Sequence, residues 1–381
     1  MLAQAFRPCT LPPDAEALRA EVREFLQTAL AAYPRADRAY SWMGFDAGFT
    51  RALAARGWVG MTWPKQYGGG ERSAFARYVL SEELMAAGAP VLAHWTADRQ
   101  SGPLILNYGS EAQKQRFLPP ICRGESYFCI GMSEPDSGSD LAATRTRGVQ
   151  VDGGWRVTCT KLWTTNAHRC HFIIALVRTT PGSERNAGLS QLIVDLHAPG
   201  VTIRPIVDLA GEAHFNEVVF EDVFVPDDCL MGAPGNGWEQ VMSELAFERS
   251  GPERYLSSVA LLTELLRLVG PAPGPQVQAA VGRMVAHMVV LRQMSLSIAG
   301  QLEARRNPLV EAACLKDLGT AFEQLMPELV HTLSDLQPTL QASADYQRVL
   351  AYVTQVAPSF SLRGGTREII RGIIARGLGL R

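Results

Sequence analysis

The spacing of apolar residues changes twice along this chain of 381 residues, and that change constrains the fold more than any other feature. Before about residue 126 and after about residue 235, apolar side chains recur every three or four residues, which is typical of amphipathic helices. Between these points, short apolar runs separated by Gly, Pro and Asn are typical of β-strands. The sequence therefore predicts an α+β chain of three domains: a helical domain at 1–125, a small β domain at 126–235 and a second helical domain at 236–381.

Within these domains, the same spacing, together with the Gly, Pro and Asn residues that interrupt it, predicts individual helices and strands. Helices are expected at 14–30, Phe45–Arg56, Ser73–Ala87, Trp238–Arg249, Gln276–Ala304 and Asn307–Thr332, and from Thr366 toward the C-terminus. Strands are expected at Trp155–Lys161, His171–Val177, Leu189–Leu196, Val201–Ile206 and Glu217–Val225. The segment Pro181–Gly188 is expected to be a hairpin-like loop whose charges lie in solvent.

The composition is that of an ordinary globular chain, with 47% apolar and 19% charged residues and a formal charge of −2. This balance, without a long run of Lys or Arg, argues against broad binding of nucleic acid or of an anionic membrane. No apolar run approaches the ~18 residues of a membrane span, and the N-terminal segment around Arg7 and Pro8 has no apolar stretch typical of a signal peptide. A cytoplasmic location is expected.

Cysteine and histidine usage points away from disulfides and metals. The seven cysteines are odd in number, scattered and without paired CxxC spacing, so they are expected to be reduced thiols that mostly fill cores. His168 and His171 have i, i+3 spacing, but no third ligand follows in a recognisable pattern. No metal site is predicted.

Two local patterns suit a cofactor with phosphates and a flat ring. The turn Ser133-Glu-Pro-Asp-Ser-Gly-Ser-Asp140 follows the apolar run Tyr127–Ile130 and offers hydroxyls and backbone N–H groups fixed by Pro and Gly, which suits a phosphate. Further on, Trp163 precedes two threonines, and an indole can stack on a conjugated ring whose nitrogens bond to hydroxyls or N–H groups. The alternatives are an ordinary turn and a core tryptophan.

Four motifs in order carry a resemblance to a known family. They are Ser133-Glu-Pro-x-x-Gly-Ser-Asp140, Lys161-x-Trp-x-Thr165, Asn216-Glu-Val-x-Phe-x-x-Val-x-Val-Pro226 and Gly364-Gly-Thr-x-Glu-Ile369. Their order and spacing resemble those of the acyl-CoA dehydrogenases, over nearly the whole chain. The resemblance implies helical, β and helical domains, with a β-barrel or sandwich in the middle and a C-terminal four-helix bundle.

The resemblance also implies an FAD cofactor, an acyl-CoA substrate and an electron-transfer flavoprotein as electron acceptor. In the family, the matching positions place Met132, Ser133, Trp163 and Thr165 against FAD and bring Ser139 toward the acyl-CoA. Gly365, Thr366 and Arg367 are expected to line the dinucleotide portion of FAD at the start of the last helix, where free N–H groups suit phosphate.

The catalytic base is the main departure from the family. Many members carry a Glu immediately before the Gly-Thr of the last motif, but this chain has Gly364 there. A subset of the family places the base on a central helix before an Arg, which matches Glu248 and Arg249. Glu248 is spaced i, i+4, i+7 with Val241 and Leu245, so it projects from an apolar face, where partial burial raises a carboxyl pKa.

Glu248 is therefore the expected base, and Arg249 is expected to help hold the substrate. The alternative is a structural ion pair of Glu248 with Arg249 or Arg254. The neighbouring acidic residues Glu244, Glu253 and Glu264 are expected at the surface.

Two further departures concern contacts between subunits. The Gln-x-x-Gly-Gly segment by which family members reach a neighbour's FAD has no glycines here around residues 328–335, and the expected Arg near 276–282 is unclear. The resemblance implies a dimer of dimers, either of identical chains or with a complementary subunit, as in some bacterial enzymes that act on steroid-derived thioesters.

Three functions follow from these patterns. The preferred one is an FAD-dependent acyl-CoA dehydrogenase that forms a trans-2-enoyl-CoA. The alternatives are a non-catalytic or half-active subunit of a heteromeric dehydrogenase, and a related flavin oxidase or monooxygenase.

Overall fold

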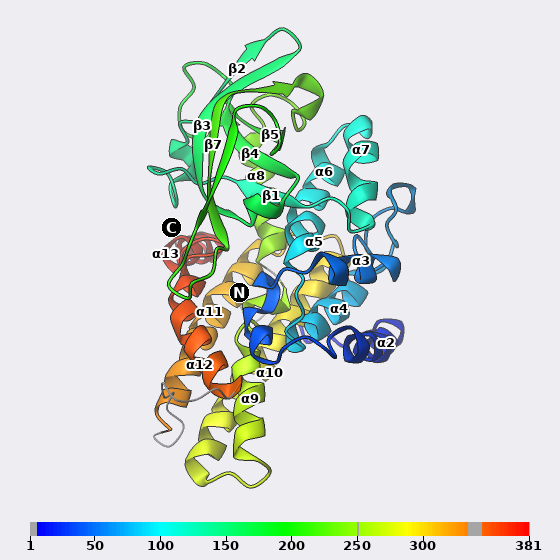
Figure 1. The fold of residues 1–381 in the computed structure, drawn as a ribbon, viewed down its shortest axis with the longest axis vertical. Helices are drawn as coiled ribbons and strands as arrows, with labels where there is room; N and C mark the ends of the chain where they lie inside the picture. The colour runs from blue at the N-terminus through cyan, green and yellow to red at the C-terminus, as the bar shows by residue number, and fades with distance from the viewer. Residues whose placement is uncertain (1–5, 250, 334–344, 381) are drawn as a thin grey trace. The chain divides into compact units, whose positions relative to one another are not determined.

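A computed structural model describes residues 6–249, 251–333 and 345–380, with only the backbone for 244–248 (Figure 1). The chain forms two compact units. Unit 1 contains Met1–Phe45, Arg72–Val91 and Glu248–Arg381, and unit 2 contains Asp46–Glu71 and Leu92–Phe247. Each unit draws on more than one of the three predicted segments, so the boundaries at 125 and 235 stay a prediction.

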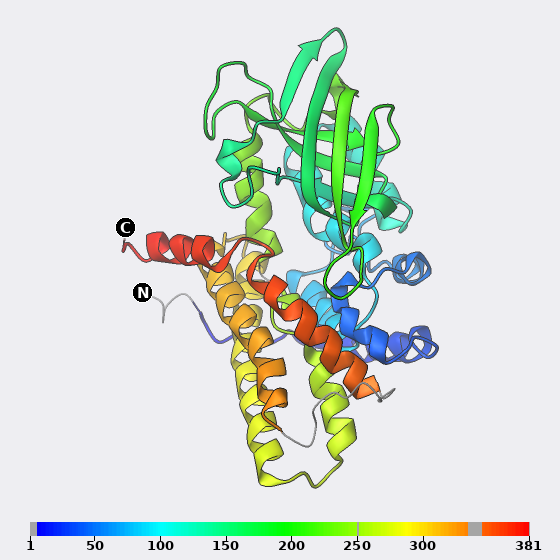
Figure 2. The same cartoon turned by 60° about the vertical axis from the view of Figure 1, so that its left-hand side comes forward.

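Unit 2 is built on one strongly twisted sheet of seven strands (Figure 2). The strands are β1 (Phe128–Gly131), β2 (Arg147–Val151), β3 (Gly154–Thr165), β4 (Phe172–Arg178), β5 (Leu189–Asp195), β6 (Val201–Ile206) and β7 (Phe215–Pro226). Their order is β1-β4-β2-β3-β7-β6, and β5 pairs with β4. The long antiparallel pair of β3 and β7 forms the centre, and a register shift interrupts it between Lys161 and Thr164.

All five predicted strands are confirmed within a few residues, whereas the prediction did not identify β1 and β2 as strands. β1 is only four residues long and runs parallel to β4, so its side chains are mostly buried and do not alternate. β2 contains Gly148, whose added Cβ would lie 2.9 Å from Val177 Cγ1 on the neighbouring strand. β1 thus lacks the period-two pattern that sequence reasoning depends on, and in β2 the pattern is short, because only Val149 and Val151 alternate with Gln150.

Unit 2 also contains helices, some of which lie beside this sheet (Figure 1). They are α3 (Ala47–Ala55), α5 (Leu92–Thr96), α6 (Gly102–Tyr108), α7 (Glu111–Cys122) and α8 (Gly237–Glu248), with short turns η2 (Lys65–Tyr67), η3 (Ala97–Ser101), η4 (Leu141–Ala143), η5 (Ala167–Arg169) and η6 (Asp227–Cys229). Their starts follow local chemistry: Asp46 caps α3, and Ser110 with Gln113 forms a capping box at α7.

His94 on α5 gives a testable pH dependence. Its ring is buried, Nδ1 lies 2.9 Å from Thr50 Oγ1, and burial lowers the pKa of His94 to about 4. In the unfolded chain the imidazole has a pKa of about 6.5, so the unfolded state binds a proton that folded His94 binds only at lower pH. The free energy of unfolding is therefore unaffected above this pH and falls as the pH drops toward 4. We expect His94 to lower it by about 3 kcal/mol between pH 7 and pH 4.

Chemical denaturation between pH 7 and pH 4 checks this prediction. In the His94→Gln variant, the pH-dependent loss should shrink by most of that amount, whereas replacement of the exposed His197 should leave it unchanged. An identical pH profile for wild type and His94→Gln would show that another group is responsible.

Unit 1 is helical. Its helices are α2 (Pro13–Ala29), α4 (Ala74–Ala86), α9 (Val259–Val269), α10 (Pro275–Glu303), α11 (Leu309–His331), α12 (Asp345–Val356) and α13 (Arg367–Gly377), with turns η1 (Ala36–Met43), η7 (Pro252–Arg254) and η9 (Ala357–Ser361). The two longest helices, α10 and α11, lie side by side (Figure 2). Each predicted helix of the chain is found with its ends shifted by a few residues at most.

Two acidic residues expected at the surface are buried, so that prediction is wrong for Glu253 and Glu264. Glu253 is 1% exposed and lies 3.4 Å from Arg254 Nε, and Glu264 is 5% exposed and forms an ion pair with Arg267 one turn later. Glu253 lies in the buried turn η7, and Glu264 lies on α9 three residues after the fully buried Leu261, on the side of the helix that faces the core. The side chain of Glu244 lies outside the described residues.

Two further expectations concern the cysteines and membrane-spanning helices. All seven cysteines are free, and most are buried, as expected for core thiols. Among the helices in the described ranges, none combines the length and the apolar character needed to cross a bilayer.

Candidate functional site

The serine-rich turn leaves the end of β1 and closes on itself. Glu134 N donates to Ser137 O at 2.8 Å and Ser137 N donates to Glu134 O at 3.1 Å, so a tight turn forms around Pro135. The Ser137 hydroxyl donates to Asp140 O at 2.8 Å. Ser139, the residue expected to approach the substrate, is exposed at the far side of this turn.

A buried ion pair fixes this turn to the sheet. Lys161 is fully buried, and its Nζ donates to Glu134 Oε1 at 2.8 Å and to the carbonyls of Leu176 at 2.7 Å and Met132 at 3.3 Å. The Glu134 carboxylate also accepts from the backbone N–H groups of Arg145 and Thr146 and from the Thr146 hydroxyl.

The ionisation of this pair follows from its surroundings. Burial raises the pKa of Glu134, but the Lys161 ammonium and the hydrogen bonds outweigh it and hold that pKa below its usual value. Burial lowers the pKa of Lys161, and the charge of Glu134 opposes this. The sequence motifs contained both residues but assigned neither a role, because nothing in a linear pattern shows that they meet.

The contact with Lys161 also sets the direction of one peptide group. Because Met132 O points at Lys161 Nζ, and the described chain has no cis peptide, Ser133 N–H points to the opposite side. The Met132 side chain packs against the core cluster of Leu176, Leu189 and Val241. The carbonyl and the side chain of Met132 are therefore both engaged within unit 2, and the backbone group that points away from Lys161 is the N–H of Ser133.

Trp163 stands on the bulge in β3. It has φ of +60°, a strained conformation for a bulky residue, and is 56% exposed. Its ring meets that of Phe215 edge-on, with centroids 6.2 Å apart. The neighbouring Thr164 is buried, and its carbonyl accepts a hydrogen bond from Asn216 Nδ2 at 3.0 Å. The C-terminal end of β3 thus presents an exposed indole, next to the partly buried Thr165.

The last motif forms a glycine turn before α13 in unit 1. Gly364 and Gly365 have φ of +66° and +94°, in the region where glycine is favoured. Two buried cations bond to their carbonyls: Arg249 Nε donates to Gly364 O at 3.0 Å and Lys316 Nζ donates to Gly365 O at 2.8 Å. A Cβ on Gly365 would lie 3.2 Å from Arg249 Nη2. The turn is therefore tied to Arg249.

The start of α13 is ordered by its own side chains. The Thr366 hydroxyl caps the helix by accepting from Ile369 N at 3.4 Å. Arg367 Nε donates to Asp317 Oδ1 at 2.7 Å, so this guanidinium is held by an ion pair on α11. The capped terminus keeps backbone N–H groups available to an anion.

The predicted residues therefore fall into two groups. Met132, Ser133, Ser139, Trp163 and Thr165 lie in unit 2, and Arg249, Gly365, Thr366 and Arg367 lie in unit 1. In unit 2 these residues lie in the serine-rich turn and at the C-terminal end of β3, and in unit 1 they lie in the glycine turn before α13 or bond to it. The side chain of Glu248 lies outside the described residues, as does part of the segment at 328–335 that lacks the expected glycines.

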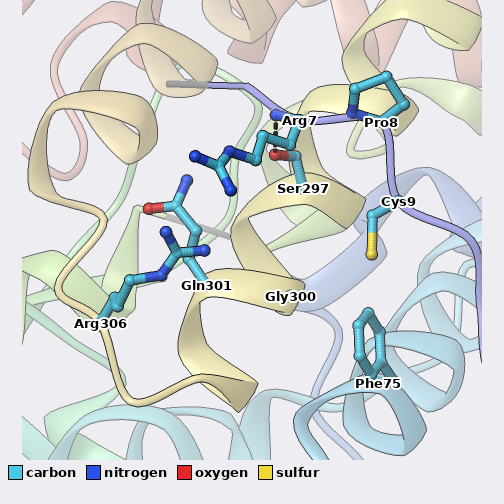
Figure 3. Close-up of a pocket in the computed structure, with 8 residues that line it drawn as sticks. All are labelled: Arg7, Pro8, Cys9, Phe75, Ser297, Gly300, Gln301 and Arg306. Carbon is cyan, nitrogen blue, oxygen red and sulfur yellow. Dashed lines mark hydrogen bonds between the residues drawn. The ribbon is translucent and has the colours of Figure 1, made fainter. Parts of the chain in front are cut away.

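Two cavities lie away from these groups, each within one unit. The first, of about 160 Å³, is lined in unit 1 by Arg7, Pro8, Cys9, Phe75, Ser297, Gly300, Gln301 and Arg306 (Figure 3). Figure 3 shows the nitrogen-rich ends of Arg7, Gln301 and Arg306 gathered on one side of it. The second, of about 370 Å³, is lined in unit 2 by residues that include His171, Asp195 and His197. Neither contains a predicted site residue.

Comparison with known proteins identifies the family. The profile described as acyl-CoA dehydrogenase, N-terminal domain, matches residues 12–125, and the one described as acyl-CoA dehydrogenase, middle domain, matches residues 129–223. Acyl-CoA dehydrogenase IpdE1 of Mycobacterium tuberculosis is 33% identical over 96% of this chain and 98% of its own length. Acyl-CoA dehydrogenase FadE34 of the same organism is 32% identical over 86% of this chain, which spans 45% of that protein.

Solved structures agree with this assignment. The structure described as the Tcur3481-Tcur3483 steroid ACAD has a TM-score of 0.85 and 26% identity, and covers 97% of this chain and 98% of its own. The ChsE4-ChsE5 complex from Mycobacterium tuberculosis has a TM-score of 0.84 and 28% identity, over 98% of this chain and 100% of its own. The fold is the expected one, with a helical N-terminal region, a curled middle sheet and a helical C-terminal region, and the chain belongs to the acyl-CoA dehydrogenase family of oxidoreductases.

Proposed function

We propose that this chain converts an acyl-CoA thioester to its trans-2-enoyl-CoA with FAD as cofactor. Two features of unit 2 carry the proposal in a chain of this family. Trp163 is exposed and has a strained backbone, and the peptide that carries Ser133 N–H is held by the bond from Lys161 to Met132 O. Strained residues persist where the surroundings over-determine them, and they cluster at ligand sites. A flat ring with hydrogen-bonding nitrogens suits this end of β3.

The residues present fit FAD in both units. In unit 2, Trp163 and Thr165 would lie against the ring system, with Met132 and Ser133 contributing backbone groups. In unit 1, Gly365, Thr366 and Arg367 would face the dinucleotide portion at the capped start of α13. When bound, FAD supplies the hydride acceptor.

Glu248 is the proposed base that takes the proton from the carbon α to the thioester. Its position on α8 directly precedes Arg249, whose guanidinium is bonded to Gly364 O. Position 364 is the one at which many family members carry their base, so the two alternative positions belong to one region of unit 1. Ser139 and Arg249 are proposed to hold the acyl-CoA, although Arg249 is 1% exposed and already donates to the glycine turn.

A partner chain and an electron-transfer flavoprotein complete the proposal. The outward side of α10 carries Val285, Val289 and Val290 at 44%, 56% and 58% exposure, and α11 carries Leu318 at 51%. Such an apolar helix face favours assembly with another chain. Two structural relatives are described as pairs of different proteins, and the family motifs missing near 276–282 and 328–335 are those that act across subunits.

The second candidate function is therefore a subunit that completes a neighbour's FAD site and does little chemistry alone. An anaerobic visible spectrum of the purified chain separates the two candidates. A bound flavin that bleaches on addition of an acyl-CoA supports the self-sufficient dehydrogenase. A chain that stays colourless with added FAD supports the partner subunit. Oxygen consumption without acyl-CoA would instead support an oxidase or monooxygenase.

Replacement of Trp163 by alanine tests the flavin face. Loss of aromatic contact is expected to weaken FAD binding by about tenfold, since such contacts contribute roughly 0.5–1.5 kcal/mol, and to shift the visible absorbance of bound flavin. Phe224→Ala is the matched control, because this side chain is 41% exposed in the same unit and is not assigned to the site. Equal FAD affinity and an unchanged spectrum in Trp163→Ala would remove Trp163 from the site.

A further inference from the structure

The smaller cavity, in unit 1, is formed where an N-terminal segment packs on the last turns of α10. Arg7 N donates to Ser297 Oγ at 3.0 Å, and a Cβ on Gly300 would lie 3.1 Å from Cys9 Sγ, so this segment lies directly against the helix. Arg306, which follows the end of α10, lines the same cavity. The cavity therefore joins two parts of the chain that are about 290 residues apart.

Two guanidinium groups gather at this cavity. Figure 3 shows the side-chain ends of Arg7 and Arg306 on the same side of it as the amide of Gln301, which is 7% exposed. Within the described ranges, the side chains of Arg7 and Arg306 form neither a hydrogen bond nor an ion pair with another residue. Both cations are thus placed at one site without a protein partner.

No acidic side chain offsets these charges. Among the described residues that line the cavity, none is Asp or Glu, and the residues that precede Arg7 in the sequence include neither. Glu303, the acidic residue nearest to Arg306 in the sequence, accepts from Ala74 N at 2.6 Å at the start of α4. Because like charges at one site repel each other, this arrangement favours an anion from outside the chain.

The size of the cavity limits the class of anion. One water needs roughly 10–15 Å³ of such space, so about 160 Å³ admits a small oxyanion with a few waters. It is well below the roughly 300–1,000 Å³ of pockets that enclose larger organic ligands. A phosphate group carries about −1.5 to −2 charges at pH 7, which matches two guanidinium groups better than a carboxylate does. Arginine binds phosphate oxygens through paired N–H donors.

We propose that this cavity binds a phosphate group through Arg7 and Arg306, and that the bound anion holds the segment Arg7–Cys9 against α10. All the lining residues belong to unit 1, and none is assigned to the dehydrogenation proposed above, so the inference is independent of that function. Both arginines are also exposed to solvent. Inorganic phosphate and the phosphate of a small monoester therefore present the same oxygens to the site.

Calorimetric titration of the full chain with inorganic phosphate at constant ionic strength tests the proposal. Two charge-assisted contacts correspond to one saturable site with a Kd of about 1 mM. Arg306→Gln and Arg7→Gln should each weaken phosphate binding by about tenfold or more. Arg305→Gln is the matched control, because Arg305 is exposed beside Arg306 and does not line the cavity. This variant should bind phosphate as the wild type does.

Alkylation of cysteine thiols locates the anion. Cys9 lines the cavity and is partly exposed, whereas the partly exposed Cys314 lies on α11 and does not line it. Phosphate at ten times its Kd should slow the labelling of Cys9 by about tenfold, because the bound anion holds the segment on α10. Labelling of Cys314 should keep its rate, as measured by mass spectrometry of the two peptides.

The outcomes divide clearly. Phosphate binding that Arg7→Gln and Arg306→Gln leave unchanged would overturn the proposal, as would a wild-type chain that binds no phosphate. Equal slowing of labelling at Cys9 and Cys314 would also contradict it, because it would show a general effect of salt. If phosphoserine binds as tightly as inorganic phosphate and depends on the same arginines, the site takes monoesters. If only inorganic phosphate binds in this way, the proposal holds with the free ion as the ligand.

Discussion

Replacing Glu248 with glutamine should abolish most of the reduction of bound flavin by acyl-CoA. Glutamine has nearly the same shape but cannot take the α-proton, and a positioned base contributes about 10²–10⁴-fold to such a step. FAD content and acyl-CoA affinity should stay close to wild type, because neither depends on proton removal. Anaerobic stopped-flow measurement of flavin bleaching gives the rate directly, without interference from the electron acceptor.

Glu244→Gln is the control for this experiment, since it makes the same chemical change one helical turn earlier on α8. Its bleaching rate should match that of the wild type. If Glu248→Gln bleaches at the wild-type rate, the base lies elsewhere and Glu248 belongs to a structural ion pair with Arg249 or Arg254. A fall in FAD content of the glutamine variant would point to the same structural role.

Replacing Lys161 with methionine should destabilise the protein by about 3–5 kcal/mol, because removal of one member of a buried ion pair leaves the other buried and uncompensated. Here that member is Glu134, which is 8% exposed and holds the serine-rich turn. The free energy of unfolding from denaturant titration measures the effect. The turn should loosen as well, and amide hydrogen exchange across residues 132–146 should speed up.

Two further variants make this prediction specific. Adding Glu134→Gln to Lys161→Met removes the orphaned charge, so the double variant should recover part of the stability. Lys65→Met breaks an exposed pair with Glu71 at 3.5 Å and should have little effect. If Lys161→Met is as stable as Lys65→Met, the buried pair does not hold the turn.

The sequence predicted the fold well where the signal is local and periodic. Helices such as α10 and α11, and strands such as β5, have long apolar patterns with clear breakers, and each was located within a few residues. The prediction failed where tertiary contacts decide the outcome. β1 is buried without alternating, and Glu253 and Glu264 are buried beside arginines with which they form ion pairs.

For the candidate site as well, the sequence indicated the motifs but not the tertiary contacts between them. Motif order placed Ser133, Trp163 and Thr366 in the family pattern, and the structure finds a held turn, an exposed indole and a helix cap at those positions. Spacing along the chain could not reveal that Lys161 bonds to Glu134, which is 27 residues away. The charges of the loop at Pro181–Gly188 lie in solvent as expected, but spacing along the chain could not reveal that Arg185 pairs with Asp140 and that its carbonyl faces Arg178.

The glycine turn before α13 has a consequence for how catalytic positions change during evolution. Gly364 has a left-handed backbone at the position where many relatives carry their base, and a glutamate there would cost about 1–2 kcal/mol in this conformation. A single codon change at 364 would therefore produce a strained carboxylate next to the bond that Arg249 makes to the turn. On our proposal that Glu248 is the base, a second carboxylate at 364 would be gained only at a cost in stability, so the left-handed glycine turn itself disfavours a return of the base to that position.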